Sequence, residues 1–299
     1  MSTHHKADLL LLLTTLLAAA GWIFSRETVQ GLEPLLFMAL RFTSAGLVLI
    51  ALGGSAMRYF TREQWKSASM VGCAFGFAMI FWILALEMTT HVGVGAFLTG
   101  LGVVLVPLIS LLFGERSGPY VYLSIPFVIA GLACLSLDSE FHLGLAEVYF
   151  LLSALLFSMT FILNSRAAAR LPVLPLTSVQ LIITGIITGV VSLLIEDWNF
   201  NQPPAIWGWL VASALIATSL RFLVQTKGQS LAPASHTAII MTLEPVWTAL
   251  LAALWLGETM TTLQFSGCAL IFFAMLVNRW PAVRAWLRPS RKEMPAKTH

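Results

Sequence analysis

Ten long apolar segments dominate this sequence, and they constrain the fold more than any other feature. A helix needs about 20 mostly apolar residues to cross the hydrocarbon core of a membrane. The segments that meet this requirement are residues 7–24, 34–52, 68–86, 93–113, 119–137, 144–164, 175–195, 205–224, 235–256 and 262–280. The sequence therefore predicts an all-α integral membrane protein with ten transmembrane helices.

The composition argues against a water-soluble globular domain. Charged residues make up 10% of the chain and hydrophobic residues 58%, whereas soluble domains carry about 25% charged and about 45–50% apolar residues. A soluble fold of this composition would expose large apolar patches. The net charge of +3 provides no broad basic field for nucleic acid. We therefore expect the lipid bilayer to surround the chain and expect no nucleic-acid partner.

The first apolar segment admits two interpretations. His4, His5 and Lys6 precede it, and its run of alanines at 18–20 resembles the cleavage site of a signal peptide. The apolar character nevertheless continues through Trp22 to Phe24, and a cleavage site tolerates such bulky aromatic residues poorly. We favour a retained transmembrane helix.

Lysine and arginine are distributed very unevenly between the two sets of connections. With the N-terminus in the cytoplasm, fourteen of the 17 basic residues lie on the inner side and only Arg26 lies outside. Arg41 and Arg221 fall within helices. Because cytoplasmic connections carry the excess of Lys and Arg, this distribution predicts that both termini are cytoplasmic, in a cell inner (plasma) membrane.

The sequence also repeats itself. A shift of 143 residues places Thr99 on Thr242 and the pair Gly114-Glu115 on Gly257-Glu258. This predicts one five-helix repeat in residues 1–138, a second in residues 139–281, and a basic cytoplasmic tail in residues 282–299. Since five is an odd number, the two repeats would insert with opposite orientation, an arrangement typical of transporters.

Several short motifs follow one another in an order that resembles a known family. The second half contains Leu243-Glu244-Pro245-Val246-Trp247 and Leu256-Gly257-Glu258, and the first half contains Ala39-Leu40-Arg41-Phe42 and Gly114-Glu115-Arg116. Together they resemble the EamA module of the drug/metabolite transporter superfamily, over roughly residues 7–280. One departure is Gly102, where the family's first copy usually has proline.

The resemblance implies a function as well as a fold. Proteins of that family are typically ten-helix exporters of amino acids, other metabolites or drugs, with a central cavity between the helices. The subgroup that this chain resembles most exports amino acids, including aromatic ones. We therefore expect a secondary exporter of small metabolites, with amino acids as the first choice and cationic drugs, nucleosides or other metabolites as the alternatives.

The sequence lacks the motifs of several other functions. It contains no P-loop, HExxH or GxSxG motif, and Cys73, Cys134 and Cys268 lie far apart with no CxxC spacing. We expect no bound cofactor and no metal, and ion-coupled exchange and facilitated diffusion both remain open. An intramembrane enzyme is a remote alternative, because His91 and His236 fall near opposite membrane faces and form no dyad.

Charged residues inside the apolar segments are candidates for function, because each costs several kcal/mol in the membrane. Arg41 lies about two turns inside the second segment and Glu244 lies near the midplane. We predict that Glu244 faces the substrate and that Arg41 is its partner. The alternative for Glu244 is a cap on a helix broken at Pro245. We expect Arg221 to reach the inner interface as an anchor.

The predicted substrate cavity combines polar, aromatic and polarizable residues from several segments. Its predicted lining is Trp22, Met79, Trp82, Thr99, Gly100, Phe157, Thr160, Asn164, Met241 and Glu244. Its clearest signal is the stripe formed by Ser153, Phe157, Thr160 and Asn164, which are spaced 4, 3 and 4 residues apart and share one helix face. Helix packing is the alternative for this stripe, and core packing is the alternative for Met79 and Trp82.

Two pairs of glycines at GxxxG spacing predict close helix packing and no ligand site. They are Gly72 with Gly76, and Gly185 with Gly189. Small residues at this spacing let two helix backbones approach each other in a membrane.

The uneven distribution of basic residues yields a prediction about topology. A cysteine placed at Arg62 should react with an impermeant maleimide only from the cytoplasmic side, and one at Asp197 only from outside. The measurement is labelling of intact cells compared with opened cells. Reaction of both positions from the same side would contradict the ten-helix arrangement.

Overall fold

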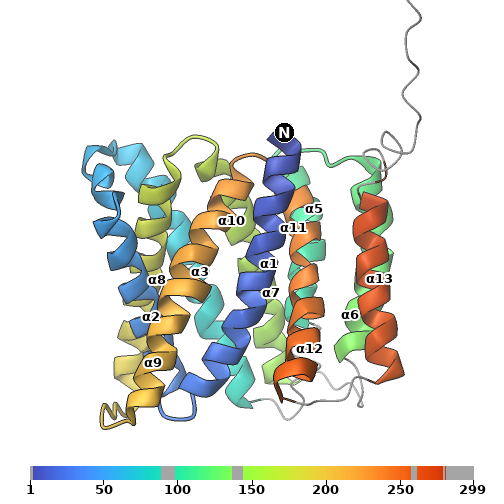
Figure 1. Cartoon of the computed structure of the whole chain (residues 1–299). Helices are drawn as coiled ribbons and strands as arrows, with labels where there is room; N and C mark the ends of the chain where they lie inside the picture. The colour runs from blue at the N-terminus through green and yellow to red at the C-terminus, as the bar shows by residue number, and fades with distance from the viewer. Residues whose placement is uncertain (1–2, 89–97, 137–143, 257–260, 279, 281–299) are drawn as a thin grey trace, which may run out of the picture.

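The structure of the chain is a computed structural model that describes residues 3–88, 98–136, 144–256, 261–278 and 280 (Figure 1). Within these ranges the chain forms helices and connecting turns, with no strand. Six helical stretches are long and apolar enough to cross a membrane: His5–Thr28, Pro34–Ala51, Arg62–Met88, Leu145–Ala168, Val173–Ile195 and Pro204–Gln229. Shorter apolar helices cover Leu98–Leu112, Pro119–Cys134 and Thr262–Asn278. The described residues thus form an all-helical membrane protein.

The individual helices have the following bounds. They are α1 (Thr3–Thr28), α2 (Pro34–Ala51), η1 (Gly54–Tyr59), α3 (Arg62–Met88), α5 (Gly102–Leu112), α6 (Pro119–Ser136), α7 (Leu145–Ala168), α8 (Val173–Ile195), α9 (Pro204–Ala212), η2 (Ser213–Leu220), α10 (Arg221–Gln229), α11 (Ala234–Met241), α12 (Leu243–Leu256) and α13 (Thr262–Asn278). The predicted copy of the repeat motif at Gly257-Glu258, the residue His91 and the tail 282–299 lie outside the described residues.

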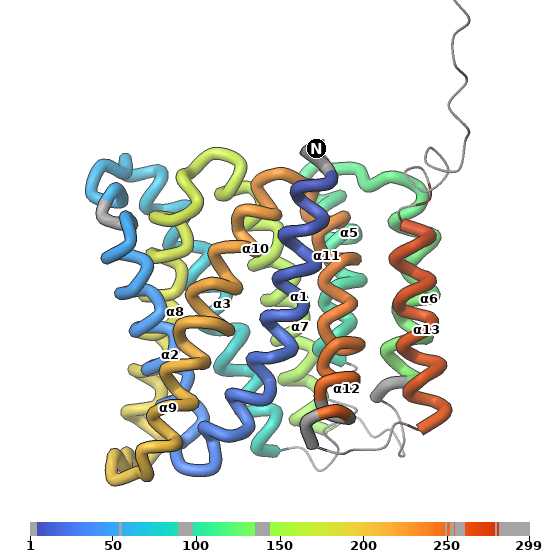
Figure 2. The backbone as a smooth tube through the Cα atoms, viewed as in Figure 1, coloured from blue at the N-terminus to red at the C-terminus, as the bar shows by residue number. Residues whose placement is uncertain are grey.

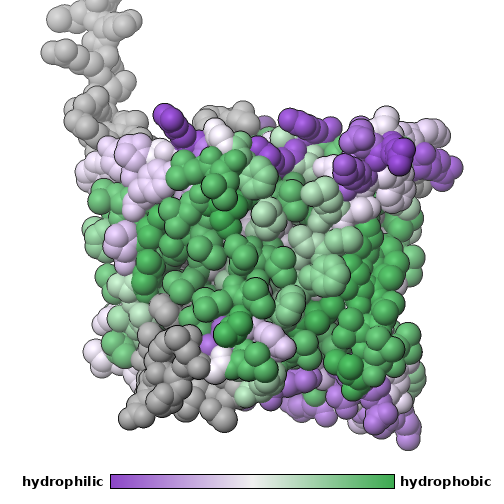
Figure 3. All heavy atoms as spheres, turned by 180° about the vertical axis from the view of Figure 1, so that it is seen from behind, coloured by the Kyte–Doolittle hydropathy of each residue, from purple (hydrophilic) through white to green (hydrophobic). Residues whose placement is uncertain are grey.

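The surface of the molecule matches a membrane environment. Figure 3 shows a broad apolar band between two hydrophilic edges. Large apolar side chains such as Phe77, Leu155 and Ile186 point outward and are exposed. Helices satisfy their own backbone hydrogen bonds, so they can present such side chains to lipid without cost.

Glycines bring neighbouring helices into close contact, as the GxxxG spacing predicts. A Cβ atom added to Gly185 of α8 would lie 2.7 Å from the backbone nitrogen of Thr43 on α2. One added to Gly72 of α3 would lie 2.8 Å from the Cβ of Ile183 on α8. The close-packing interpretation is therefore confirmed at these two glycines.

Gly102, the departure from the usual proline, also has a packing role. It begins α5, and a Cβ atom at this position would lie 2.9 Å from the carbonyl oxygen of Ala154 on α7. The hydroxyl of Ser158 donates a hydrogen bond of 2.7 Å to the Gly102 carbonyl. The glycine thus lets the α5 backbone rest directly on α7.

An aromatic cluster joins α2, α3 and α10 in the core. The ring of Phe75 lies 5.5 Å from that of Phe42 and 5.2 Å from that of Phe222, both in edge-on arrangements. Such geometry places the positive edge of one ring on the negative face of another. The cluster holds α10, which carries part of the site described below, against the first half of the chain.

The start of α2 is capped by an acid from a distant part of the chain. The carboxylate of Glu196, directly after α8, accepts hydrogen bonds from the backbone N–H groups of Leu35 (2.7 Å) and Leu36 (2.8 Å). These N–H groups have no partner within their own helix, and the negative charge suits the positive end of the helix dipole. The contact fixes one end of α8 to α2.

The contact at Gly185 predicts the effect of a single added methyl group. Gly185→Ala should force α2 and α8 apart and destabilise the fold by about 1–3 kcal/mol, the usual cost of overpacking. Gly208→Ala is the matched control, because nothing lies within 4 Å of a Cβ at Gly208. Thermal unfolding in detergent measures both, and equal melting temperatures for the two variants would contradict the close contact.

Candidate functional site

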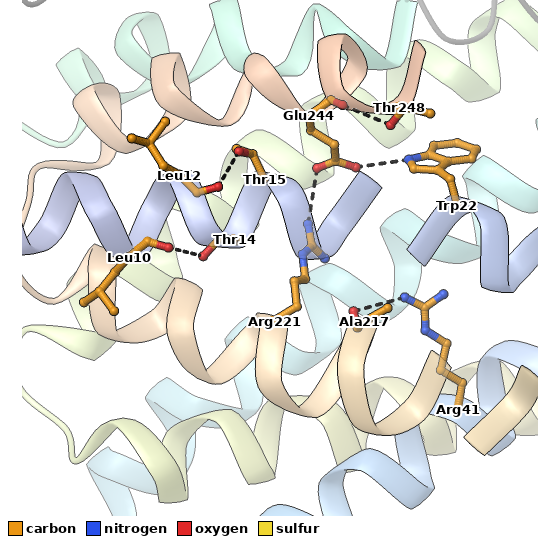
Figure 4. Close-up of polar contacts among 10 residues, drawn as sticks. All are labelled: Leu10, Leu12, Thr14, Thr15, Trp22, Arg41, Ala217, Arg221, Glu244 and Thr248. Atoms are coloured by element: carbon orange, nitrogen blue, oxygen red, sulfur yellow. Dashed lines mark hydrogen bonds and ion pairs between the residues drawn. The ribbon is translucent and has the colours of Figure 1, made fainter. Parts of the chain in front are cut away.

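Glu244 lies where two helices meet. The helix α11 ends at Met241, Thr242 forms a turn, and α12 begins at Leu243. The Oε1 atom of Glu244 accepts a hydrogen bond of 3.2 Å from the indole nitrogen of Trp22 on α1. Its Oε2 atom lies 3.5 Å from a guanidinium nitrogen of Arg221 on α10 (Figure 4). The carboxylate therefore joins α12 to α10 and to α1, which lies at the other end of the sequence.

Arg221 points into the protein, so its predicted role as an interfacial anchor is wrong. The helix that carries it continues to Gln229, five residues beyond the predicted end, and Arg221 therefore lies more than two turns from the inner end. Its guanidinium lies 4.5 Å from the ring centre of Phe222 and pairs with Glu244. A signal for this orientation was present in the sequence: Arg221, Gln225 and Gln229 are spaced four apart and share one face.

Arg41 is held by neutral groups. It is 9% exposed, and its Nε donates to the Thr218 hydroxyl at 2.5 Å and one Nη to the Ser25 hydroxyl at 3.0 Å. The other Nη donates to the Ala217 carbonyl at 3.5 Å, as Figure 4 shows. The predicted ion pair between Arg41 and Glu244 is thus corrected: Glu244 pairs with Arg221.

Arg41 finds neutral partners instead of Glu244 because of η2, a π-helical stretch between α9 and α10. Within it the hydroxyl of Thr218 donates to the carbonyl of Ser213, five residues earlier, at 2.9 Å. The wider turns of a π-helix are rare and frequently occur at functional sites. This stretch supplies a hydroxyl and a carbonyl to Arg41, which needs several acceptors in an apolar environment.

Two tryptophans form an aromatic wall beside the ion pair. Trp22 is 45% exposed, and its ring lies 5.9 Å from that of Trp82 in an edge-on arrangement. Trp82 and Met79 on α3 are partly buried and pack against the core around Phe75. Trp22 thus places an aromatic ring next to the carboxylate of Glu244, a combination that suits ligands with both charge and apolar surface.

The stripe on α7 faces the interior but contacts other partners. The ring of Phe157 lies 5.9 Å from that of Phe75 and so belongs to the aromatic core. The hydroxyl of Thr160 donates to the Leu156 carbonyl at 2.8 Å. The amide of Asn164 donates to the side chain of Gln229 and, at 3.4 Å, to the Thr226 hydroxyl. These contacts place Asn164 at the far end of α10 from Arg221.

The other residues predicted to line the cavity have different surroundings from the ion pair between Arg221 and Glu244. A Cβ atom on Gly100 would lie 3.1 Å from Leu132, so this residue faces α6. Thr99 is half-buried, and its hydroxyl has no hydrogen-bond partner among the described residues. Met241, directly before the break, is buried. The contacts described above therefore connect Trp22, Trp82, Arg221 and Glu244.

The site can bind charged groups but offers little for a metal. In the part of the chain that the structure describes, no three His, Cys, Asp or Glu residues form a group that could hold a metal ion. The chemistry available at Glu244 is ion pairing, hydrogen bonding and proton binding.

The apolar band, the long helices and the charged cluster between them define a multi-pass membrane protein with a polar site in its interior. The sequence profile of the EamA-like transporter family matches residues 5–137 and again residues 144–280. The chain therefore belongs to the EamA-like transporter family.

Comparisons with individual proteins agree with this assignment. Two uncharacterized transporters of Archaeoglobus fulgidus are each 25% identical to the chain. One match spans 210 residues, 70% of this chain and 75% of the relative, and the other spans 276 residues, 91% and 85% respectively. A solved crystal structure matches with a TM-score of 0.81 at 21% identity, covering 94% of this chain and 99% of the other, which supports the fold.

The ion pair yields a prediction about stability. Arg221→Met should lower the melting temperature, because it leaves the carboxylate of Glu244 without its cation, at a cost of about 2–3 kcal/mol. The double variant Arg221→Met with Glu244→Gln should recover most of this loss, because neither charge remains. Thermal unfolding in detergent tests the pair, and a double variant that loses as much as the two single variants together would contradict it.

Proposed function

We propose that this protein is a secondary transporter that exports small metabolites by alternating access, with amino acids as its first substrate class. The observation that carries the proposal is the carboxylate of Glu244, shared between Arg221 and Trp22 at the break between α11 and α12. Broken helices that present charged groups inside the membrane are typical of substrate sites in secondary transporters.

The packing of the helices supports ten transmembrane helices in two inverted repeats, in residues 1–138 and 139–281. In two such repeats α1 would be equivalent to α7, and α3 to α10. The contact between α3 and α7 then has its counterpart in the contact between α10 and α1. The helices α2 and α8, which would be equivalent, pack against each other, and so do α6 and α13 (Figure 1). A two-fold relation between the halves would produce this pattern and would let them exchange roles between two states.

The edges of the molecule support cytoplasmic termini and insertion in the cell inner (plasma) membrane. The N-terminal end of α1 lies on the same edge as η1 and the turn that follows α10 (Figure 2). Basic residues such as Arg62 and Lys227 belong to the segments at this edge. An excess of Lys and Arg on one side is typical of the cytoplasmic face.

The chemistry of the site supports amino acids. The guanidinium of Arg221 has an Nε without a partner among the described residues, so it can donate to a substrate carboxylate. Glu244 can accept hydrogen bonds from an ammonium group, and the exposed face of Trp22 can cover an apolar or aromatic side chain. Cationic drugs are the second candidate, because a carboxylate beside two tryptophans also suits an organic cation.

The decisive experiment is uptake into proteoliposomes with a panel of amino acids, with and without a proton gradient. If Glu244 binds a substrate amine or a coupling proton, Glu244→Gln should reduce transport by about tenfold or more, or abolish its pH dependence, because glutamine accepts a hydrogen bond but carries no charge. Glu147→Gln is the matched control, since the partly exposed Glu147 carboxylate accepts only from the nearby Gly144 N–H among the described contacts (2.8 Å). A Glu244→Gln profile identical to that of the parent would leave Glu244 a structural role only.

A further inference from the structure

A shallow cavity of about 320 Å³, open to the surface, lies apart from the site around Glu244. Its walls are the C-terminal end of α7, the turn between α10 and α11, and Glu115. The turn lies on the edge that also carries the N-terminal end of α1 (Figure 2). We call it the inner cavity; its lining residues include Ser165, Arg166, Ala169 and Gln229.

The floor of the inner cavity holds polar groups whose hydrogen bonding is incomplete. Gln229 is 2% exposed, Asn164 behind it is 3% exposed, and Ser165 is 8% exposed. One amide hydrogen bond joins Asn164 to Gln229. The Nε2 atom of Gln229, the Oδ1 atom of Asn164 and the Oγ atom of Ser165 are buried without a hydrogen-bond partner among the described residues.

This deficit does not depend on how the two amides are oriented. A single hydrogen bond between two carboxamides always leaves one N–H₂ group and one carbonyl oxygen with spare capacity. Each buried polar group without a partner costs about 1–3 kcal/mol, and native proteins retain few of them. Gln229 and Ser165, which line the cavity, can therefore donate hydrogen bonds to a ligand that presents an acceptor.

The rim of the cavity adds groups of both charges. Arg166 pairs with Glu115 at 2.8 Å and donates to the Phe113 carbonyl at 3.1 Å, and both charged side chains are partly exposed. Ala234, also in the wall, begins α11, where free backbone N–H groups favour a negative group. The carboxylate of a small zwitterion can lie near Arg166 and the N-terminus of α11, and its ammonium can lie near Glu115. A simple anion would be repelled by the Glu115 carboxylate.

We propose that the inner cavity is a second binding site, which takes the zwitterionic headgroup of an α-amino acid before it reaches Glu244. The carboxylate accepts hydrogen bonds from the Gln229 amide and the Ser165 hydroxyl, and the ammonium donates to the Glu115 carboxylate, which also lines the cavity. The proposal rests on the function proposed above, because it assigns this site to the same class of substrate.

The polar face of α10 connects the inner cavity with the central site. Arg221, Gln225 and Gln229 follow one another at intervals of four residues and therefore share a face. Each has a buried polar atom without a hydrogen-bond partner in the described part of the chain: Nε of Arg221, Oε1 of Gln225 and Nε2 of Gln229. Polar groups with spare capacity thus continue from the floor of the inner cavity to the partner of Glu244.

The test measures binding directly, on the purified full-length protein in detergent. Ala169→Cys places a thiol in the exposed wall of the cavity, and a bound ligand should slow the reaction of this thiol with a maleimide. The parent has three cysteines of its own, so its labelling is subtracted. Glycine, L-alanine and L-phenylalanine should each slow this reaction. Propionate and ethylamine, which carry only one of the two charges, should not do so at the same concentrations.

The added substitution Gln229→Leu should raise the amino-acid concentration needed for half-protection by about tenfold, because it removes a hydrogen bond to a charged group. Gln180→Leu is the matched control, since Gln180 is also buried but lies on α8 away from the cavity. Ser165→Ala, which removes a single oxygen, should also raise the amino-acid concentration needed for half-protection. It replaces Gln229→Leu in the test if that variant fails to fold. Equal protection in all variants, no protection by any amino acid, or full protection by propionate or ethylamine alone would overturn the proposal.

Flux measurements on the parent separate this proposal from the proposed function. Amino-acid flux without protection at Ala169→Cys would overturn the inner site and leave the export function standing. Protection without flux would support the inner site and count against export of these amino acids.

Discussion

The hydrocarbon core of a membrane offers no hydrogen-bond partner, so every charged side chain inside this bundle depends on groups from the chain itself. Arg221 and Glu244 satisfy each other across α10 and α12. Arg41 instead takes two hydroxyls and a carbonyl from α1 and η2. These contacts join helices from both halves of the sequence, and the packing of α1 between α10 and α12 follows from them.

Much of the fold follows from the sequence because the bilayer imposes a simple length requirement. Helices lie over the predicted apolar segments, although α10 extends five residues further and the ninth segment is interrupted at Thr242. Apolar content indicates where a helix crosses the membrane but does not indicate where it ends, because polar residues such as Gln225 and Gln229 continue a helix when other helices bury them.

The sequence predicts the candidate site less completely than the fold, because apolar content shows neither where a helix ends nor where its backbone rearranges. Glu244 and Trp22 were expected in the site, and their contact joins two of the predicted residues. The apolar pattern predicts a membrane-surface position for Arg221, because that pattern ends at residue 224 while the helix continues to Gln229. The neutral partners of Arg41 depend on the π-helical stretch η2, which rearranges backbone groups without a recognisable pattern in the sequence. Asn164 was expected beside the central site, but its partner Gln229 lies at the opposite end of α10.

The two halves of the chain resemble each other in packing but differ in charge. Under the shift of 143 residues, Glu244 falls on Leu101, so the first half of the chain has no acid at that position. With Arg41, Arg221 and Glu244 ionised, the cluster carries one net positive charge inside the apolar band. A charge held there is subject to the electric field across the membrane, which is worth about 2.3 kcal/mol per elementary charge for each 100 mV traversed. A carboxylate ligand without an amine would cancel that net charge and a zwitterion would preserve it, so the membrane potential would act differently on the protein with each kind of cargo.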